Sequence, residues 1–312
     1  MDKFKIKLVY GFFKVLSLLP LRVLLALSDC FVYPLVYHVV GYRLKVVRRN
    51  LRNSFPSMSD KELKTIERRF YRHFCDSFME TVRILSMSRE EAVQRMHFVN
   101  PELVTNYLSK GQGVMMMLGH YGNWEYQPFL FLNVLESEKQ EGFSVYRPLK
   151  SKSFDHLYYK IRTHFDGGVV TKDETYRTII RLKRAGKPGV FGMVCDQSPS
   201  RNNLHYWTNF LHQDTSILTG SERIAVKTGF AVIFADVEKL GRGYYQTTYH
   251  LISDNPQETA PNEITEQYAR LMEQTILRDP AYWLWTHKRW KHHRSDQASA
   301  EQPQTSSTDS GF

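Results

Sequence analysis

The chain has 312 residues, 42% hydrophobic and 13% aromatic, which is enough for one large α/β domain or two small ones. Its formal charge is +10, and residues 1–294 alone carry +13 because the last eighteen hold three acids and no Lys or Arg. This charge indicates an anionic partner (lipid, an acidic carrier protein, a phosphate-bearing substrate or nucleic acid) or a solubilising surface. Three scattered cysteines, Cys30, Cys75 and Cys195, argue against a disulfide framework or zinc site and fit a reducing compartment.

The N-terminal region is apolar and predicts a membrane anchor over residues 1–42. Its cleanest apolar run, residues 23–41, is about 19 residues and roughly 28 Å long as a helix, close to the thickness of one bilayer core. A carboxylate, a proline and a histidine interrupt the run: Asp29, Pro34 and His38. We therefore expect either a kinked spanning helix or one or two helices lying in the membrane interface.

A basic cluster follows the apolar run directly: Arg43, Lys45, Arg48, Arg49 and Arg52. Basic residues in this position favour the cytoplasmic side of a membrane and anionic head groups. The alternative is an ordinary solvated helix face.

Residues 53–135 predict two helices, a strand and a further helix. Ser59 and Glu62 have the spacing of a capping box, so a helix is expected over 60–85, with a second one starting at Ser88. The apolar run 114–118 between glycines predicts a buried strand. Asn123 can cap the helix that follows, which we expect to reach Leu135.

The remaining pattern alternates strands and helices up to a polar tail. Strands are expected at 143–146, 190–194 and 231–237, with an edge strand at 243–252; helices are expected at 153–165, 173–185, 216–228 and 264–277. This predicts one α/β domain over residues 43–294, a largely parallel sheet flanked by helices. Residues 295–312 are rich in Ser, Gln and Thr and predict a disordered tail.

A candidate catalytic pair, His120 and Glu125, lies between a predicted strand and a predicted helix. Five residues on one helix would place the two side chains about 140° apart, so they converge only if the chain turns, as Gly119 and Gly122 permit. The His can take a proton from an attacking hydroxyl, and the carboxylate can orient the imidazole. N–H groups at the helix start after Asn123 could stabilise an oxyanion. Taken alone, the H-x4-E spacing is weak, since a lone His is more often structural.

In its context this segment, Gly-His-Tyr-Gly-Asn-Trp-Glu over residues 119–125, resembles the first block of the lysophospholipid acyltransferase superfamily. The form is that of the bacterial lipid A late acyltransferases. Four further segments are similar in the same order: 49–56, 145–150, 194–199 and 283–291. The resemblance covers roughly residues 12–291 and implies a glycerolipid-acyltransferase-like α/β fold.

The resemblance also implies roles for individual residues. His120 would be the general base and Glu125 its partner. Arg147 would bind phosphate or assist at the acyl carbonyl, since a guanidinium forks onto such oxygens. Asp196 would line the same pocket and organise Arg147 or the acceptor. The alternatives are a surface ion pair for Arg147 and a turn residue for Asp196.

Two further residues are expected to bind substrate, Asn123 and Gln197. The family usually has a Phe-Phe-Gly or similar stretch after its third block, whereas residues 209–216 hold no glycine here. That departure leaves Thr215 and Thr219 as candidates for acceptor contacts.

The aromatic C-terminal block predicts a mixture of core and interface. We expect Trp283 and Trp285 to be buried, and Trp290 to lie near lipid phosphates with the basic residues around it, Lys288, Arg289 and Lys291. The nearby His287, His292 and His293 have no Cys or spaced acids beside them, so we expect no metal.

The function implied by the resemblance is transfer of a fatty acyl group from acyl carrier protein to a hydroxyl of a lipid A precursor, without metal or cofactor. The expected location is the inner membrane, with the catalytic domain on its cytoplasmic face and bound to anionic lipid. One alternative is the same chemistry on a lysophospholipid or aminolipid. Another is a non-catalytic basic protein that binds membranes or nucleic acid, but helix-turn-helix, zinc-finger and RNA-recognition signatures are absent, and no nucleic-acid partner is expected. The oligomeric state stays open.

Overall fold

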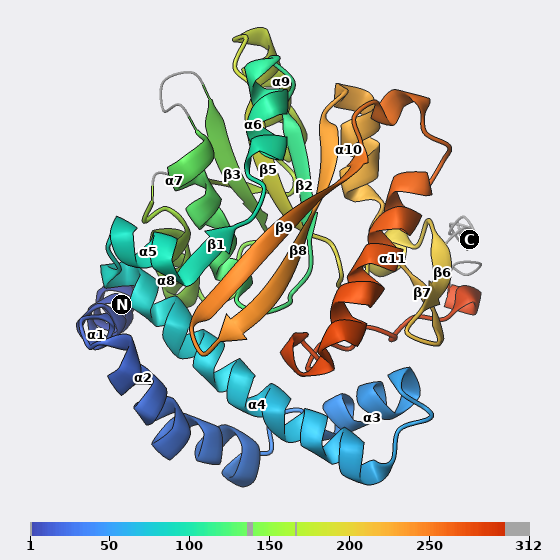
Figure 1. The fold of residues 1–312 in the computed structure, drawn as a ribbon. Coiled ribbons are helices and arrows are strands. Elements are labelled where there is room, and N and C mark those ends of the chain that lie inside the picture. Colours follow the sequence, from blue (N-terminus) through green and yellow to red (C-terminus); the bar gives the residue numbers. More distant parts are fainter. Residues whose placement is uncertain (1, 136–139, 166, 297–312) are drawn as a thin grey trace, which may run out of the picture.

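A computed structural model describes residues 2–135, 140–165 and 167–296. At its centre is a seven-stranded sheet in the order β1-β9-β8-β2-β5-β3-β4 (Figure 1). Its strands are β1 (Met96–Phe98), β2 (Val114–Leu118), β3 (Glu141–Tyr146), β4 (Gly168–Thr171), β5 (Gly189–Val194), β8 (Ala231–Gly241) and β9 (Tyr244–Ser253). All pairs are parallel except β8–β9. The predicted α/β fold with a largely parallel sheet is confirmed.

The central strand β2 is apolar throughout because both of its faces are covered. Every residue from Val114 to Leu118 is at most 3% exposed. A strand that is buried on both sides gains nothing from polar alternation, so it reads as one continuous hydrophobic run. The close packing begins at Gly113, where an added Cβ would lie 2.3 Å from the ring of Phe230.

The expectation that residues 243–252 form an edge strand is wrong. β9 lies between β8 and the short strand β1, with Met96 opposite Tyr245. The alternation in β9 arises because Tyr245, Thr247 and Tyr249 face the core while the residues between them are more exposed. A three-residue strand such as β1 gives too little pattern to be recognised in the sequence.

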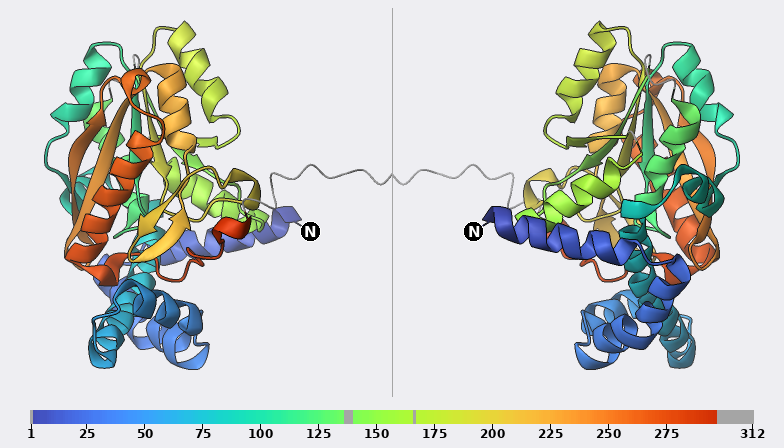
Figure 2. Two further views of the ribbon diagram at one scale, coloured as in Figure 1. Left: turned by 90° about the vertical axis from the view of Figure 1, so that its right-hand side faces the viewer. Right: turned by 90° about the vertical axis from the view of Figure 1, so that its left-hand side faces the viewer.

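Helices flank the sheet, as Figures 1 and 2 show. They are α5 (Arg89–Arg95), α6 (Glu102–Ser109), α7 (Phe131–Val134), α8 (Lys152–Arg162), α9 (Thr175–Arg184), α10 (Gly220–Thr228) and α11 (Glu263–Arg278), with short 3-10 helices that include η3 (Ile84–Ser86), η4 (Trp124–Leu130) and η7 (Pro280–Tyr282). A hairpin of β6 (Trp207–Phe210) and β7 (Gln213–Ser216) was not predicted. It takes up the residues before α10, which therefore begins later than expected.

The long helix α4 (Asp60–Arg83) crosses below the sheet (Figure 1). Its predicted capping box is confirmed: the Ser59 side chain accepts from the N–H of Glu62, and the Glu62 side chain accepts from the N–H of Ser59. The box satisfies two N–H groups that the first turn of a helix leaves unpaired. Asp60 and Glu62 also favour this end electrostatically.

The N-terminal region consists of α1 (Asp2–Ser17), α2 (Leu21–Leu27), the π-helical segments Ser28–Val32 and Pro34–Val39, and α3 (Leu44–Ser54). Of these, α2 and the π-helical segments lie along α4, on the side away from the sheet (Figure 1), whereas α1 packs mainly against α8. Residues Leu21–Val39 form one stretch of 19 residues with a mean hydropathy of 1.3, long and apolar enough to cross a membrane by length and composition. Only 22% of its most apolar window is buried, so most of this surface faces outward.

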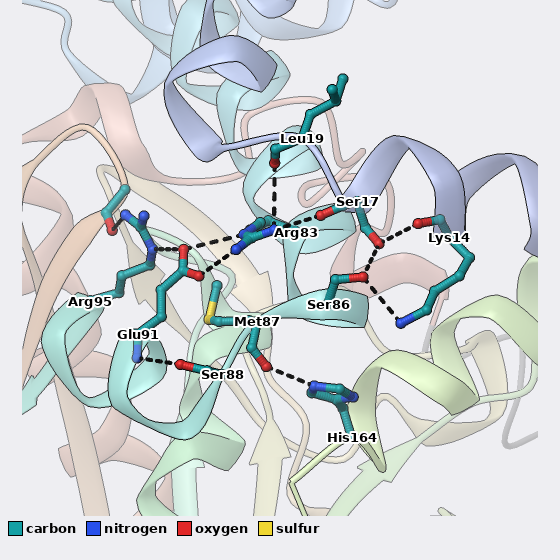
Figure 3. A network of polar contacts seen from close by, with 11 residues as sticks. Lys14, Ser17, Leu19, Arg83, Ser86, Met87, Ser88, Glu91, Arg95 and His164 are labelled. Atoms are coloured by element: carbon teal, nitrogen blue, oxygen red, sulfur yellow. Dashed lines mark hydrogen bonds and ion pairs between the residues drawn. The ribbon is translucent and has the colours of Figure 1, made fainter.

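Polar contacts attach α1 to the end of α4 (Figure 3). Arg83 donates to the carbonyl oxygen of Ser17 at 2.7 Å and forms an ion pair with Glu91 at 2.7 Å. The hydroxyls of Ser17 and Ser86 lie 2.7 Å apart. The division into an anchor over 1–42 and a domain over 43–294 stays a prediction, and residues 297–312 of the predicted disordered tail lie outside the described residues.

Candidate active site

The candidate site lies where β2 and β5 end side by side. Leu118 and Val194 are paired across these parallel strands, so His120 and Asp196 each follow their strand by two residues. The loop after β2 runs very close to α11: a Cβ at Gly119 would lie 2.3 Å from the sulfur of Met272. Gly122 has φ +60°, a left-handed conformation that favours glycine. The turn therefore requires glycine at position 122, whereas Gly119 makes room for the side chain of Met272.

The imidazole of His120 is bound by Asp196. Nδ1 of His120 lies 2.6 Å from Oδ1 of Asp196, and the backbone N–H of His120 donates to Oδ2 at 2.9 Å. The indole N–H of Trp283 donates to the same Oδ2 at 2.7 Å. The carboxylate is 4% exposed, so its orientation is fixed by three hydrogen bonds.

Asp196 is ionised in this setting. Burial alone would raise the pKa of its carboxyl, but the neighbouring His120 and the hydrogen bonds from His120 and Trp283 lower that pKa to about 2. An ionised carboxylate can only accept, so it places the imidazole proton on Nδ1. Nε2 of His120 then carries the lone pair that a general base requires.

Gln197 lies at Nε2, the basic nitrogen. Its amide nitrogen is 3.1 Å from Nε2 of His120 and can donate to the lone pair there. Gln197 also lines a cavity of about 380 Å³ at the carboxyl ends of β3 and β5. Its lining mixes cationic and hydroxyl side chains with apolar ones such as Met193 and Ile224, and we call it the polar cavity after the former. Arg147, Lys172 and Arg223 line the same cavity, which has no Asp or Glu in its lining.

Arg147 and Asp196, expected to cooperate, are not hydrogen-bonded to each other. Arg147 is exposed and lines the polar cavity, while Asp196 is buried against His120 and Trp283. Of the other candidates, Thr219 lines the polar cavity. Thr215 accepts a hydrogen bond from the buried Arg289 at 2.7 Å.

Glu125 does not orient His120, contrary to expectation. Its carboxylate accepts two hydrogen bonds from Arg162, at 2.6 and 2.8 Å, while both ring nitrogens of His120 have other partners. The cause is local: η4 begins directly after Asn123, and its first turn directs Glu125 towards α8. The side chain of Glu125 is 6% exposed and that of Arg162 is 19% exposed, so this ion pair is largely buried.

The side chain of Asn123 makes all of its hydrogen bonds to neighbouring protein groups. Its carbonyl oxygen accepts from Thr81 and from the N–H of Glu125, as the predicted helix cap. Its amide nitrogen donates to Glu80 and to the carbonyl oxygen of Ser77. With all four hydrogen-bonding positions occupied, this side chain holds the loop. Asn123 also lines an apolar cavity beside α4, and its contact with substrate stays a prediction.

Part of the predicted oxyanion site is also occupied within η4. The N–H groups of Glu125 and Tyr126 at the start of that helix are both taken, by the side chain and the carbonyl oxygen of Asn123. The amide of Gln197 is the donor that faces the basic nitrogen instead.

Two apolar cavities meet at Trp124 and Glu125. One lies against the sheet beside β2, β3 and β5, with Met116, Val190 and Gly192 in its wall. The other, about 290 Å³, lies between α4 and the N-terminal segments and is lined by apolar residues that include Val32, Val36, Phe74 and Phe78. The ring of Trp124 packs edge-on against His120, with centroids 4.9 Å apart. The imidazole therefore lies between polar and apolar surroundings.

The C-terminal block lies against the loop after β2, residues 119–123, where Tyr121 pairs with Trp283. We refer to residues 119–123 as the catalytic loop, after the candidate residue His120. Trp283 and Trp285 are 3% and 0% exposed, as predicted. Arg289 is 2% exposed and donates to Thr215 and to the carbonyl oxygen of Ser216, so its predicted location near lipid phosphates is wrong. The residues that sequence reasoning missed at the site are the hydrogen-bond donor Trp283 and the partner of Glu125, Arg162. Neither stood out, because each role arises only from long-range contacts.

A metal site is not formed by the described residues: none of their His, Cys, Asp and Glu side chains gather in groups of three or more suited to hold an ion. His287 forms a hydrogen bond within the protein instead of contributing to a metal site. Its Nε2 accepts from the backbone N–H of Ser198 at 3.1 Å. Burial, only partly opposed by Asp196, lowers the pKa of His287 to about 4, so it stays neutral and supports the loop that carries Gln197.

An α/β fold with a partly exposed His, held by a buried Asp, between polar and apolar cavities suits an enzyme that acts on a molecule with both kinds of surface. The sequence model for bacterial lipid A biosynthesis acyltransferases matches residues 2–292, and the chain belongs to this family of acyltransferases. A relative is the lipid A biosynthesis lauroyltransferase of Escherichia coli (strain K12). It is 22% identical over 277 residues, which cover 83% of this chain and 86% of the relative.

Proposed function

We propose that this chain transfers a fatty acyl group from acyl carrier protein to a hydroxyl of a lipid A precursor, with His120 as the general base. The observation that carries the proposal is the position of Nε2 of His120. It faces Gln197 of the polar cavity, and the imidazole packs against Trp124, which lines both apolar cavities. An acyl ester formed on a polar glycolipid requires these two environments to meet at the reacting atom.

In this mechanism the acceptor hydroxyl displaces the Gln197 amide and donates its proton to Nε2. The hydroxyl oxygen attacks the carbonyl carbon of the acyl thioester, the carbon–sulfur bond breaks, and the thiolate takes the proton back from Nε2. Asp196 stabilises the transient imidazolium. The amide N–H of Gln197, only 3.1 Å away in the free enzyme, is available to the charge that develops on the carbonyl oxygen.

The other residues divide between the two substrates. Arg147 is assigned to the polar part of the acceptor or to the phosphate of the carrier's prosthetic group, since a guanidinium binds such oxygens bidentately. Glu125 fixes Arg162 in the lining of the apolar cavity against the sheet. This cavity would take the acyl chain. The excess positive charge of the chain suits both an acidic carrier and anionic lipid on the cytoplasmic face of the inner membrane.

The test is acyl transfer from acyl carrier protein to a purified lipid A precursor by the full chain. His120→Ala should lower the rate by about a thousandfold or more, because general-base catalysis contributes 10²–10⁴-fold. His97→Ala is the matched control, since His97 lies on β1 in the same sheet and outside the site. A His120→Ala variant that turns over at the wild-type rate would remove His120 as base.

A lysophospholipid acceptor is the second candidate, because the cavity beside the N-terminal segments is lined largely by apolar side chains, which would contact the acyl chain of either lipid. Lysophospholipid and lipid A precursor can be offered to the same preparation. Preferred transfer to the lysophospholipid would keep the chemistry and overturn the acceptor.

A further inference from the structure

A second charged cavity lies behind the catalytic loop and has no role in the chemistry above. Its volume is about 640 Å³, and it opens between α4, the β8–β9 hairpin and the apolar N-terminal stretch. Four cations contribute to its lining: Arg69, Arg72, Lys239 and Arg242. Two carboxylates, Asp29 and Asp76, do so as well, which leaves two cationic charges in excess if all ionise.

The carboxylates are already committed to one arginine. Arg242 donates to Asp29 at 2.7 Å and to both oxygens of Asp76 at 2.7 Å. Arg69 is paired with Asp279, outside the cavity lining. Among the described residues this leaves Arg72 and Lys239 without an ion pair.

Of these two cations, Lys239 has the more unusual environment. Its ammonium is largely buried, lies 4.9 Å from the ring centre of Tyr282, and has Nδ1 of His73 at 3.1 Å. His73 is fully buried, and burial followed by the charge of Lys239 lowers its pKa well below the usual value, so it is a neutral neighbour. The carboxylates of Glu80 and Asp76 act on Lys239 only at longer range, because Glu80 is bound to Tyr245 and Asn123 and Asp76 to Arg242. A cation held in this way costs free energy unless an anion joins it.

The surroundings indicate what kind of anion fits. Tyr33 and Pro34 of the apolar N-terminal stretch form one wall of the cavity. The same stretch exposes large apolar side chains: Phe31 (67%), Leu35 (53%) and Val39 (76%). A ligand in this cavity would therefore meet an apolar surface directly beside the cations. That combination matches an anionic head group attached to acyl chains.

We infer that the cavity of Arg72 and Lys239 binds the phosphate group of a membrane lipid. Arginine and lysine donors suit phosphate oxygens, and a phosphate supplies the charge that the cavity lacks. The site adjoins the catalytic loop, because His73 also contacts the carbonyl oxygen of Gly122 at 3.2 Å. Binding of a lipid phosphate does not depend on the proposed function; only the assignment of that phosphate to the acceptor rests on it.

Direct binding by the full chain in neutral detergent micelles tests the site without any need for catalysis. The probe is dioctanoyl phosphatidic acid, with dioctanoylglycerol as its phosphate-free match. Arg72→Gln and Lys239→Met should each raise the Kd for the phosphatidic acid about tenfold and leave that for dioctanoylglycerol unchanged. Arg177→Gln, which removes an exposed cation from α9, should change neither.

Two results would overturn the inference. One is an unchanged Kd for phosphatidic acid in both variants. The other is displacement of phosphatidic acid by inorganic phosphate of equal affinity, which would remove the lipid from the assignment.

A kinetic comparison identifies the lipid. If the phosphate belongs to the acceptor, Arg72→Gln raises KM for the phosphorylated lipid A precursor and not for the dephosphorylated one. If it belongs to the surrounding phospholipid, KM rises equally for both. Either outcome supports a lipid-phosphate site. The binding experiment needs no acyl transfer, so its result would hold even if the proposed acyltransferase activity were disproved.

Discussion

Asp196 accepts three hydrogen bonds, and a carboxamide in its place can accept only some of them. His120 N–H and the Trp283 indole both donate to Oδ2, so the oxygen of an Asn would have to occupy that position. Its NH₂ group would then face Nδ1 of His120 and force the ring proton onto Nε2, where a base needs a lone pair. We expect Asp196→Asn to lower kcat by about 10³–10⁴.

Steady-state acyl transfer by the full chain measures this effect. Trp283→Phe removes one donor while keeping the ring and should have a smaller effect. A kcat within tenfold of wild type in Asp196→Asn would contradict the assignment of Asp196.

Glu125 and Arg162 should behave differently, as a pair whose members depend on each other. Glu125→Gln leaves a mostly buried guanidinium without its counter-charge and should destabilise the fold by roughly 2–3 kcal/mol. The double variant Glu125→Gln/Arg162→Gln should recover part of that loss. Thermal unfolding of the two variants and the wild type measures it. If Glu125 instead orients His120, Glu125→Gln will reproduce the loss of kcat of Asp196→Asn.

At the scale of elements, the sequence predicted the individual strands and helices better than the order of the strands in the sheet and the contacts that follow from it. The runs at β2 and β5 and the capping box of α4 are local patterns, so they were predicted correctly. The pairing of His120 with Asp196 requires β2 and β5 to be neighbours in register, and that follows from strand order, which no local pattern contains. For the same reason the sequence named Glu125, five residues away, as the partner rather than Asp196, seventy-six residues away.

β5 contributes one position that should set acyl-chain length. Gly192 lines the apolar cavity, and an added Cβ there would have only ordinary contacts, 3.8 Å to the carbonyl oxygen of Phe143 and 3.9 Å to Leu118. Gly192→Ala should therefore fold normally while filling about one methylene of space. One buried methylene contributes about 0.8 kcal/mol, so the preference between chains that differ by one methylene should shift about fourfold towards the shorter.

Competition between acyl carrier proteins loaded with different chains gives that preference directly. Gly11→Ala, at a position in α1 with open space around it, is the matched control. An unchanged chain-length profile in Gly192→Ala at normal turnover would show that the acyl chain lies elsewhere.

At the scale of the whole molecule, the N-terminal stretch is packed along the body of the protein. Leu21, Leu24 and Leu25 of α2 pack with Met79 of α4. Further along, the hydroxyl of Tyr37 donates to the buried Glu67 at 2.8 Å. These contacts hold the stretch alongside α4, which carries many charged side chains. A spanning arrangement would bring those charged side chains into the apolar core of the bilayer.

The salt bridge from Asp29 to Arg242 fixes the middle of the stretch to the β8–β9 hairpin. We therefore expect residues 21–39 to lie in the membrane interface rather than to span it, with Phe31 and Val39 in the lipid. Alkaline carbonate should then release the full chain from isolated membranes. The double variant Phe31→Asn/Val39→Asn should weaken vesicle binding by about 2 kcal/mol, roughly thirtyfold. Val93→Asn, at an exposed apolar residue of α5, should have no effect, and retention of the wild type in carbonate-washed membranes would show a spanning helix instead.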